Sequence, residues 1–250
     1  MNIYFIGDIG LYNEVSYQIA NEINDEIKED DIIILLGDNF YPYGVKDDLD
    51  EQFKLFEELN FKNDVYAILG NHDHLGEPLP QINYTNWIMD NFYYQKTFDN
   101  IDIFFIDTCL INPNNFCLSD DIISFKIGID VEFIKNKMML WLHNKLSKSK
   151  KDIKIICGHY PIISFGKYSW NKTIANSLIP IITKYKVDYY VSGHDHNLQI
   201  IPVKTKEYTF TQIISGAASC LYSLKNEKVN YGWIKLNKNK IDKKLINKKN

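Results

Sequence analysis

The chain has 250 residues, of which 45% are hydrophobic and 24% charged, and its formal net charge is −4 at pH 7. This length suffices for one substantial domain with a buried core, and the lack of any long uncharged apolar stretch argues against a membrane-spanning helix. Basic residues are not interleaved with aromatic ones as in a single-strand nucleic-acid binder, so we expect a soluble enzyme domain.

Strands and helices are predicted to alternate along the chain. Apolar runs rich in Ile, Val, Tyr and Phe indicate buried strands, and longer amphipathic stretches indicate helices. Strands are predicted over residues 2–6, 32–36, 101–106, 153–156, 187–191, 208–214 and 229–234, and helices over residues 14–26, 49–59, 131–147 and 173–185. This order is typical of an α/β fold. One domain is expected over residues 1–236, followed by a Lys- and Asn-rich tail over residues 237–250.

Five short motifs with metal-binding residues follow apolar runs. They are Gly-Asp-Ile-Gly at 7–10, Gly-Asp-Asn-Phe-Tyr at 37–41, Gly-Asn-His-Asp-His at 70–74, Gly-His-Tyr-Pro at 158–161 and Gly-His-Asp-His at 193–196. In an open α/β sheet, loops that leave the strand ends converge on one edge, so distant residues can meet there. Five of the six histidines lie inside these motifs, and only His143 lies outside, where we interpret it as a surface or packing residue.

The residue types in the motifs narrow the chemistry. Asp, Asn and His offer oxygen and nitrogen donors, and no cysteine joins them, which favours Fe, Zn or Mn. A structural zinc site would usually contain paired cysteines at short spacing. Two metals that share a carboxylate serve phosphoryl hydrolysis, so the motifs predict one two-metal hydrolase site.

The order and form of the motifs resemble the calcineurin-like metallophosphoesterases and, within them, the small tartrate-resistant type of purple acid phosphatase. Longer matches extend over residues 37–45, 70–76 and 193–199, and the resemblance covers about residues 3–219. It implies an α/β fold, a four-layer αββα sandwich of two mixed sheets flanked by helices. It also implies an acid phosphatase that cleaves phosphate monoesters with a metal-bound hydroxide.

The resemblance also implies the metal ligands. Asp8, Asp38, Tyr41 and His196 would bind one metal, and Asn71, His159 and His194 the second, with Asp38 bridging both. A phenolate ligand needs a strong Lewis acid, which favours Fe(III) beside a divalent Fe, Zn or Mn ion. The five positive charges of such a pair, less four from two aspartates, a phenolate and a hydroxide, leave roughly one unit that attracts phosphate.

Other residues of the motifs are expected to act beside the ligands. His72 would protonate the leaving oxygen of the substrate. Alternatively, His72 would only orient a neighbouring metal ligand. His74 and Asp195 are interpreted as supporting residues. The relatives place a further histidine in the substrate pocket after the position matched by His159, but this chain has none there. Tyr168 or Lys167 could hold phosphate instead, or the segment could be an ordinary exposed loop.

Two alternatives stay open. On the same fold, a phosphodiesterase or nucleotidase with two divalent metals would leave Tyr41 without a catalytic role. A non-enzymatic scaffold is disfavoured, because all seven ligand positions carry competent residues. The expected partner is a phosphorylated small molecule or phosphoprotein, with no nucleic acid or membrane, and the chain is expected to be a monomer.

The beginning of the chain and its cysteines bear on location. The first predicted strand starts at Asn2, which leaves no room within this chain for a signal peptide before Asp8. Four cysteines lack the spacing of a disulfide framework, so we expect reduced thiols. Together these features favour an intracellular or a non-classically exported protein.

Overall fold

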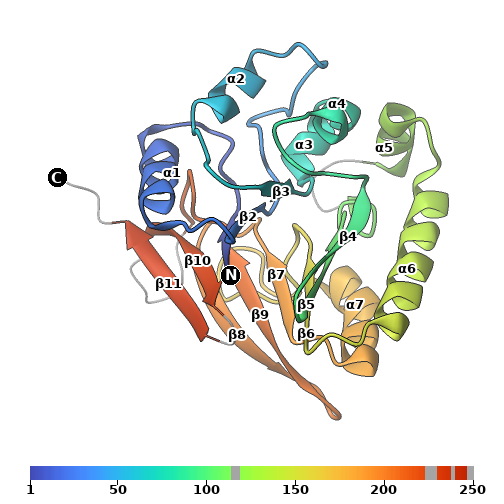
Figure 1. Ribbon diagram of the computed structural model, residues 1–250. Helices are drawn as coiled ribbons and strands as arrows, with labels where there is room; N and C mark the ends of the chain where they lie inside the picture. Colours follow the sequence, from blue (N-terminus) through green and yellow to red (C-terminus); the bar gives the residue numbers. More distant parts are fainter. Residues whose placement is uncertain (114–118, 223–229, 238–239, 247–250) are drawn as a thin grey trace.

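Figure 1 presents the computed structural model of the chain, which describes residues 1–113, 119–222, 230–237 and 240–246. The strands are β1 (Asn2–Ile6), β2 (Ile32–Leu35), β3 (Val65–Ala67), β4 (Tyr93–Phe98), β5 (Ile101–Ile106), β6 (Ile153–Cys157), β7 (Tyr189–Ser192), β8 (Leu198–Lys204), β9 (Thr209–Ser215), β10 (Tyr231–Asn237) and β11 (Lys240–Ile246). The helices are α1 (Glu14–Glu26), α2 (Gln52–Glu57), α3 (Asn71–Leu75), α4 (Pro78–Asn83), α5 (Asp120–Ile127), α6 (Val131–Lys148) and α7 (Lys172–Tyr185).

The strands form two mixed sheets. The first has the order β11-β10-β1-β2-β3, with β1, β2 and β3 parallel and the other pairs antiparallel. The second has the order β4-β5-β6-β7-β9-β8, in which β5, β6, β7 and β9 are parallel and the edge strands antiparallel. Figure 1 shows α1 beside β10, and α6 and α7 beside the second sheet on the other side of the molecule. The predicted sandwich of two sheets flanked by helices is therefore confirmed.

The two sheets meet in a core of large side chains. Residues of β1, β2 and β5 are buried on both faces, which explains why these strands read as continuous apolar runs in the sequence. A polar contact also joins the sheets. The buried Ser215 hydroxyl at the end of β9 donates to the Phe5 carbonyl, 2.7 Å away, and accepts from the Ile234 amide at 3.1 Å. It thereby links β9 to β1 and β10 of the other sheet.

Helix α1 has the predicted bounds because its sequence contains a clear start signal. The Asn13 side chain accepts hydrogen bonds from the amides of Val15 and Ser16 and satisfies two donors of the first turn. Residues three and four apart, such as Ile19 and Ile23, face the core. None of the described helices is long and apolar enough to cross a membrane.

Two predicted segments differ from the structure. The helix predicted over residues 49–59 is confined to α2, since an irregular turn precedes Gln52 and the helix ends at Glu57. In the expected C-terminal tail, residues 240–246 instead form β11, which pairs antiparallel with β10 and buries Ile246. Its lysines lie along an exposed edge strand, where charge discourages pairing with other chains. The predicted strand over 229–234 is β10, and residues 229, 238–239 and 247–250 lie outside the described part of the chain.

Candidate metal centre

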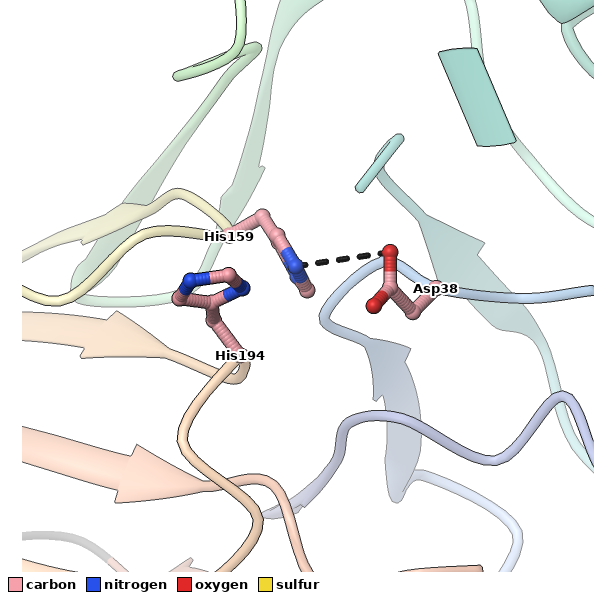
Figure 2. Close-up of side chains that lie close together, drawn as sticks. All are labelled: Asp38, His159 and His194. Atoms are coloured by element: carbon pink, nitrogen blue, oxygen red, sulfur yellow. Dashed lines mark ion pairs between the residues drawn. The ribbon is translucent and has the colours of Figure 1, made fainter. Parts of the chain in front are cut away.

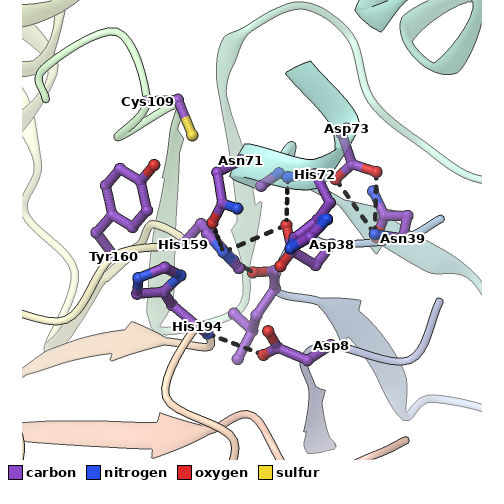
Figure 3. A network of polar contacts seen from close by, with 12 residues as sticks. Asp8, Asp38, Asn39, Asn71, His72, Asp73, Cys109, His159, Tyr160 and His194 are labelled. Atoms are coloured by element: carbon purple, nitrogen blue, oxygen red, sulfur yellow. Dashed lines mark hydrogen bonds and ion pairs between the residues drawn. The ribbon is translucent and has the colours of Figure 1, made fainter. Parts of the chain in front are cut away.

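All five motifs lie at the carboxyl ends of parallel strands. Asp8 and Asp38 follow β1 and β2, and Asn71 begins α3 after β3, all in the first sheet. His159 and His194 follow β6 and β7 in the second sheet. Figure 3 shows these side chains converging from separate loops, as the sequence predicted. The site therefore sits across the junction of the two sheets.

The backbone is strained at three of these positions. Asp8, Asp38 and His194 have φ angles of +61°, +53° and +65°, in the left-handed region that side chains other than glycine seldom adopt. Each such residue costs on the order of 1 kcal/mol and persists only where its surroundings hold it. Strain at three polar residues that face one another is typical of a functional site.

Four polar atoms form the first cluster. The Tyr41 hydroxyl lies 3.1 Å from Asp8 Oδ1, 3.0 Å from Asp38 Oδ2 and 3.1 Å from His196 Nε2. His196 Nε2 is 3.2 Å from Asp8 Oδ1. Ligand atoms bound to one ion at about 2.0–2.2 Å would lie roughly 3 Å apart. The predicted ligands of the first metal thus have the spacing that a single ion requires.

The second cluster is built around His159. Its Nε2 lies 3.1 Å from Asn71 Oδ1 and 3.4 Å from Asp38 Oδ1. Figure 2 shows His194 facing the same space, and one ligand atom from each of Asp38, His159 and His194 lies within 4.8 Å of the others. Because Oδ2 of Asp38 faces the first cluster and Oδ1 the second, this carboxylate is placed to bridge two ions.

Hydrogen bonds orient the candidate ligands. The carbonyl of Leu36 can only accept, so His159 Nδ1, 2.8 Å away, donates to it and Nε2 is the ring nitrogen left to face the cluster. The His194 amide donates to Asp8 Oδ2 at 2.8 Å, and the His72 amide donates to Asp38 Oδ1 at 2.9 Å. Backbone donors therefore fix both carboxylates before any ion binds.

The electrostatics of the clusters fit a cation. Burial disfavours the charged form of His159 and His196, but neighbouring aspartates outweigh burial and raise their pKa values to about 9 and about 11. Burial and the carboxylates of Asp38 and Asp8 raise the pKa of Tyr41 well above its usual value. Protons thus compensate the buried carboxylates in this state. Metal ions would take over that role, and the carboxylate, imidazole, amide and phenol donors suit Fe, Zn or Mn.

His72 lies beside the clusters and is partly exposed. Its Nδ1 is 2.6 Å from the carbonyl of Pro42, to which it must donate. The ring packs edge to face against Tyr41, with 4.5 Å between the ring centroids. Since Nδ1 carries a hydrogen, Nε2 is protonated only in the imidazolium form, which suits an acid that gives up its proton.

Asp73 and Asp195 hold the motif loops in place. Asp73 is buried and accepts from the amides of Asn39, Phe40 and Gly70, so it joins the loop after β2 to the start of α3. Asp195 accepts from the Ser164 hydroxyl and from Asn197 Nδ2, and so attaches the loop after β6 to the loop after β7. His74 contacts Asp107 instead, with Nε2 at 2.7 Å from Oδ2.

An aromatic layer covers two of the candidate ligands. The Tyr168 ring stacks on His194 with centroids 3.9 Å apart, and the Tyr222 ring stacks on His196 at 4.1 Å. The Lys167 ammonium lies 4.1 Å from the centroid of the Tyr222 ring and 5.1 Å from that of Tyr168. Lys167 and Tyr168, which the sequence offered as candidates for holding phosphate, therefore lie next to two candidate metal ligands, His194 and His196.

Two residues of the site were missed in the sequence. Cys220 Sγ is 2.8 Å from His196 Nδ1, and Tyr222 stacks on the same ring. The nearest signal in the sequence is the small-residue run at 215–218. A Cβ on Gly216 would lie 2.7 Å from Asp8 Oδ2, so this run does border the first cluster.

Comparison with known proteins identifies relatives. The family model for calcineurin-like phosphoesterase matches residues 1–198. Tartrate-resistant acid phosphatase type 5 of Rattus norvegicus is 30% identical over 239 residues, which cover 86% of this chain and 71% of the rat protein. The human protein of the same name is also 30% identical, and the match covers 86% of this chain and 71% of the human protein.

Solved structures share the fold. GAP50, the anchor in the inner membrane complex of Plasmodium, has a TM-score of 0.71 at 24% identity, with 98% of this chain and 84% of that chain covered. Purple acid phosphatase PPD1 of yellow lupin has a TM-score of 0.69 at 14% identity, over 98% of this chain and 51% of that chain. These likenesses agree with the predicted fold, and the relatives above confirm the resemblance found in the sequence. The chain belongs to the calcineurin-like phosphoesterase family and is a homologue of the tartrate-resistant, or purple, acid phosphatases.

Proposed function

We propose that this chain is a purple acid phosphatase that hydrolyses phosphate monoesters at a binuclear Fe(III)–M(II) centre, in which M is Fe, Zn or Mn. The observation that carries the proposal is the division of the Asp38 carboxylate between two clusters, one of which contains Tyr41. When bound, the two ions supply an activated water and positive charge for the phosphate oxygens.

The proposed ligands follow from the two clusters. Asp8, Asp38, Tyr41 and His196 would hold the Fe(III), and Asn71, His159 and His194 would hold the divalent ion together with Asp38. The phenol supports a trivalent ion, because burial and two carboxylates raise its pKa and only a strong Lewis acid would keep it deprotonated near neutral pH. A pair of divalent ions would leave the centre with less positive charge to attract phosphate.

His72 is proposed as the general acid. The ring is partly exposed beside the two clusters, and the Pro42 carbonyl holds its Nδ1 hydrogen. Its Nε2 proton can then pass to the ester oxygen as the bond from phosphorus breaks. This assignment agrees with the sequence resemblance and makes His72 a catalytic residue that binds no metal.

Lys167 is proposed to hold the substrate phosphate in place of the histidine found in relatives. Two tyrosine rings hold its ammonium beside the proposed histidine ligands, and no ion pair of the described residues involves Lys167. The loop that carries it is fixed, because the Phe165 amide donates to Gln199 Oε1 at 2.9 Å and the Lys167 amide approaches Asp195 Oδ1 at 3.4 Å. A fixed positive charge at this place would favour a phosphate dianion.

Substrate comparison tests the proposal. Protein loaded with iron and zinc is expected to hydrolyse 4-nitrophenyl phosphate faster than bis(4-nitrophenyl) phosphate, and Asp38→Asn should abolish both reactions. Faster hydrolysis of the diester would support the divalent-metal phosphodiesterase instead. A fully loaded protein with no activity on any phosphate ester would point to a scaffold that has kept only the fold.

A further inference from the structure

A buried cluster of His74, Asp107 and Cys109 shares no residue with the proposed binuclear centre. One ligand atom from each of the three side chains lies within 4.8 Å of the others. The side chains of His74 and Asp107 are 0% and 1% exposed, and Cys109 is also fully buried. The proposed function assigns no role to this cluster.

The Asp107 carboxylate is held between the other two members of the cluster. Its Oδ1 accepts from the Cys109 amide at 2.9 Å, and its Oδ2 lies 2.7 Å from His74 Nε2. The turn after β5 of the second sheet therefore places the thiol beside the carboxylate, and α3, which follows β3 of the first sheet, supplies the imidazole. Hydrogen bonds of this kind commonly orient the carboxylate ligand of a metal ion.

Two buried polar atoms at this cluster lack an oxygen or nitrogen partner among the described residues. They are His74 Nδ1 and the Tyr160 hydroxyl. Tyr160 contacts the Cys109 thiol, and Figure 3 shows its hydroxyl directed toward Cys109. A buried polar atom without a partner calls for an explanation such as a bound water or ion. These two atoms therefore point to a ligand independently of the spacing of the three side chains.

The side-chain types fit a divalent ion of the zinc class. Zinc takes imidazole, carboxylate and thiolate ligands, whereas magnesium and calcium prefer oxygen alone. A dication with one carboxylate, one thiolate and a neutral imidazole has no net charge, which suits a place that is shielded from water. In the absence of a cation, burial and then Asp107 raise the pKa of the Cys109 thiol well above its usual value, so the thiol stays protonated.

We propose that His74, Asp107 and Cys109 bind a structural zinc ion, separate from the two ions of the phosphatase centre. On binding, the thiol proton passes to the solvent and the sulfur bonds to zinc as a thiolate. The Tyr160 hydroxyl then donates to this thiolate, which accepts more strongly than a thiol. A buried water takes the fourth position of the tetrahedral ion. The ion joins α3 to the loop after β5 in the other sheet.

Replacement of zinc by cobalt tests the proposal through the thiolate. Co(II) bound to a thiolate gives an intense charge-transfer band in the near ultraviolet, which oxygen and nitrogen ligands do not produce. Cobalt-loaded wild-type protein is expected to show this band, and Cys109→Ser to lose it. The matched control is Cys157→Ser, because Cys157 is an equally buried thiol outside the cluster. Cys117→Ser and Cys220→Ser cover the other two cysteines, and all three controls should keep the band.

Metal content separates this ion from the binuclear centre. Zinc-loaded wild-type protein should contain about three ions per chain, and Cys109→Ser about two. Asp38→Asn removes the carboxylate proposed to bridge the other two ions, but it should keep the cobalt–thiolate band. A protein that has the band but no phosphatase activity would therefore contradict the proposed function and leave the zinc site standing.

The absence of the band from wild-type protein would overturn the zinc site. So would a band that survives in Cys109→Ser, or one that is lost in any of the three control variants. If Cys109→Ser does not fold, persistence of the band in all three controls still assigns it to Cys109, since the chain has four cysteines.

Discussion

Replacement of Tyr41 by Phe is expected to abolish the visible colour of the iron-loaded protein. A tyrosinate bound to Fe(III) gives a broad charge-transfer band, which other metal pairs at this site would lack. The substitution keeps the ring that packs against His72 and removes only the hydroxyl that contacts Asp8, Asp38 and His196. It therefore tests the iron ligand with little change in packing.

The magnitude follows from the free energy needed to ionise the phenol. At pH 7 the deprotonation of an ordinary phenol, with a pKa near 10, costs about 4 kcal/mol, since each pKa unit is worth about 1.4 kcal/mol. Burial beside two carboxylates raises the pKa of Tyr41 and increases this cost. Metal-free protein should therefore show no tyrosinate absorption at neutral pH. The band can appear only with an ion whose binding to the phenolate is more favourable than the deprotonation of Tyr41 is costly.

The assay compares visible spectra of wild-type protein, Tyr41→Phe and Tyr43→Phe after loading with iron and mild oxidation. Tyr43 is a matched control, because it lies two residues away in the same loop and is 69% exposed. The band is expected in the wild type and in Tyr43→Phe only. A band that persists in Tyr41→Phe, or a wild-type protein that stays colourless with iron bound, would refute the assignment of Fe(III) to Tyr41.

Three further outcomes are expected. His72→Ala should lower kcat on an alkyl phosphate about 100-fold but much less on 4-nitrophenyl phosphate, whose leaving group needs no proton; equal losses would contradict the acid role. Lys167→Met should raise KM for 4-nitrophenyl phosphate about threefold to tenfold at unchanged kcat. The control is Lys186→Met, because Lys186 precedes β7 and its ammonium also lies over a tyrosine ring, 4.9 Å from the centroid of Tyr208. This control substitution should change neither constant. Burial opposes ionisation of Asp102, but side-chain hydrogen bonds outweigh burial and lower its pKa in the folded protein. The ionised carboxylate therefore stabilises the folded state at any pH above the pKa that Asp102 has in the unfolded chain. This stabilisation is lost as the pH falls through the lower pKa of the folded protein. Urea unfolding should show Asp102→Asn less stable than the wild type by about 1–2 kcal/mol at pH 7, with a smaller difference below about pH 4; a constant difference would contradict the linkage.

Local signals explain what could be predicted from the sequence. The start of α1 is marked by Asn13, whose side chain caps the first turn. The site was predictable because each motif directly follows a strand, and parallel strands bring their carboxyl ends to one edge. The seven residues expected to bind metal were all brought together in this way, although their roles as ligands remain a proposal.

Long-range contacts explain what the sequence did not reveal. Cys220 and Tyr222 contact His196 because β8 and β9 form an antiparallel pair, which returns the chain to the loops that carry the candidate ligands. Strand β11 was missed because its lysines resemble a solvated tail until β10 is present to pair with it. Helix α3 has only five residues, too few for a periodic pattern, and Asp73 stabilises its start through the Gly70 amide.

The placement of both clusters across the two sheets has a consequence for assembly. Each proposed ion would be bound by ligands from both sheets. The aspartates Asp8 and Asp38 follow strands of the first sheet, whereas the histidines follow strands of the second: His159, His194 and His196. Each ion would therefore cross-link the two sheets of the sandwich. The free energy of metal binding then adds to the cohesion of the sheets, by about 4 kcal/mol when the free ion exceeds its Kd 1,000-fold. The coupling is reciprocal. A substitution that loosens the contact between the sheets, such as Ser215→Ala, should weaken metal affinity even though Ser215 contributes no ligand.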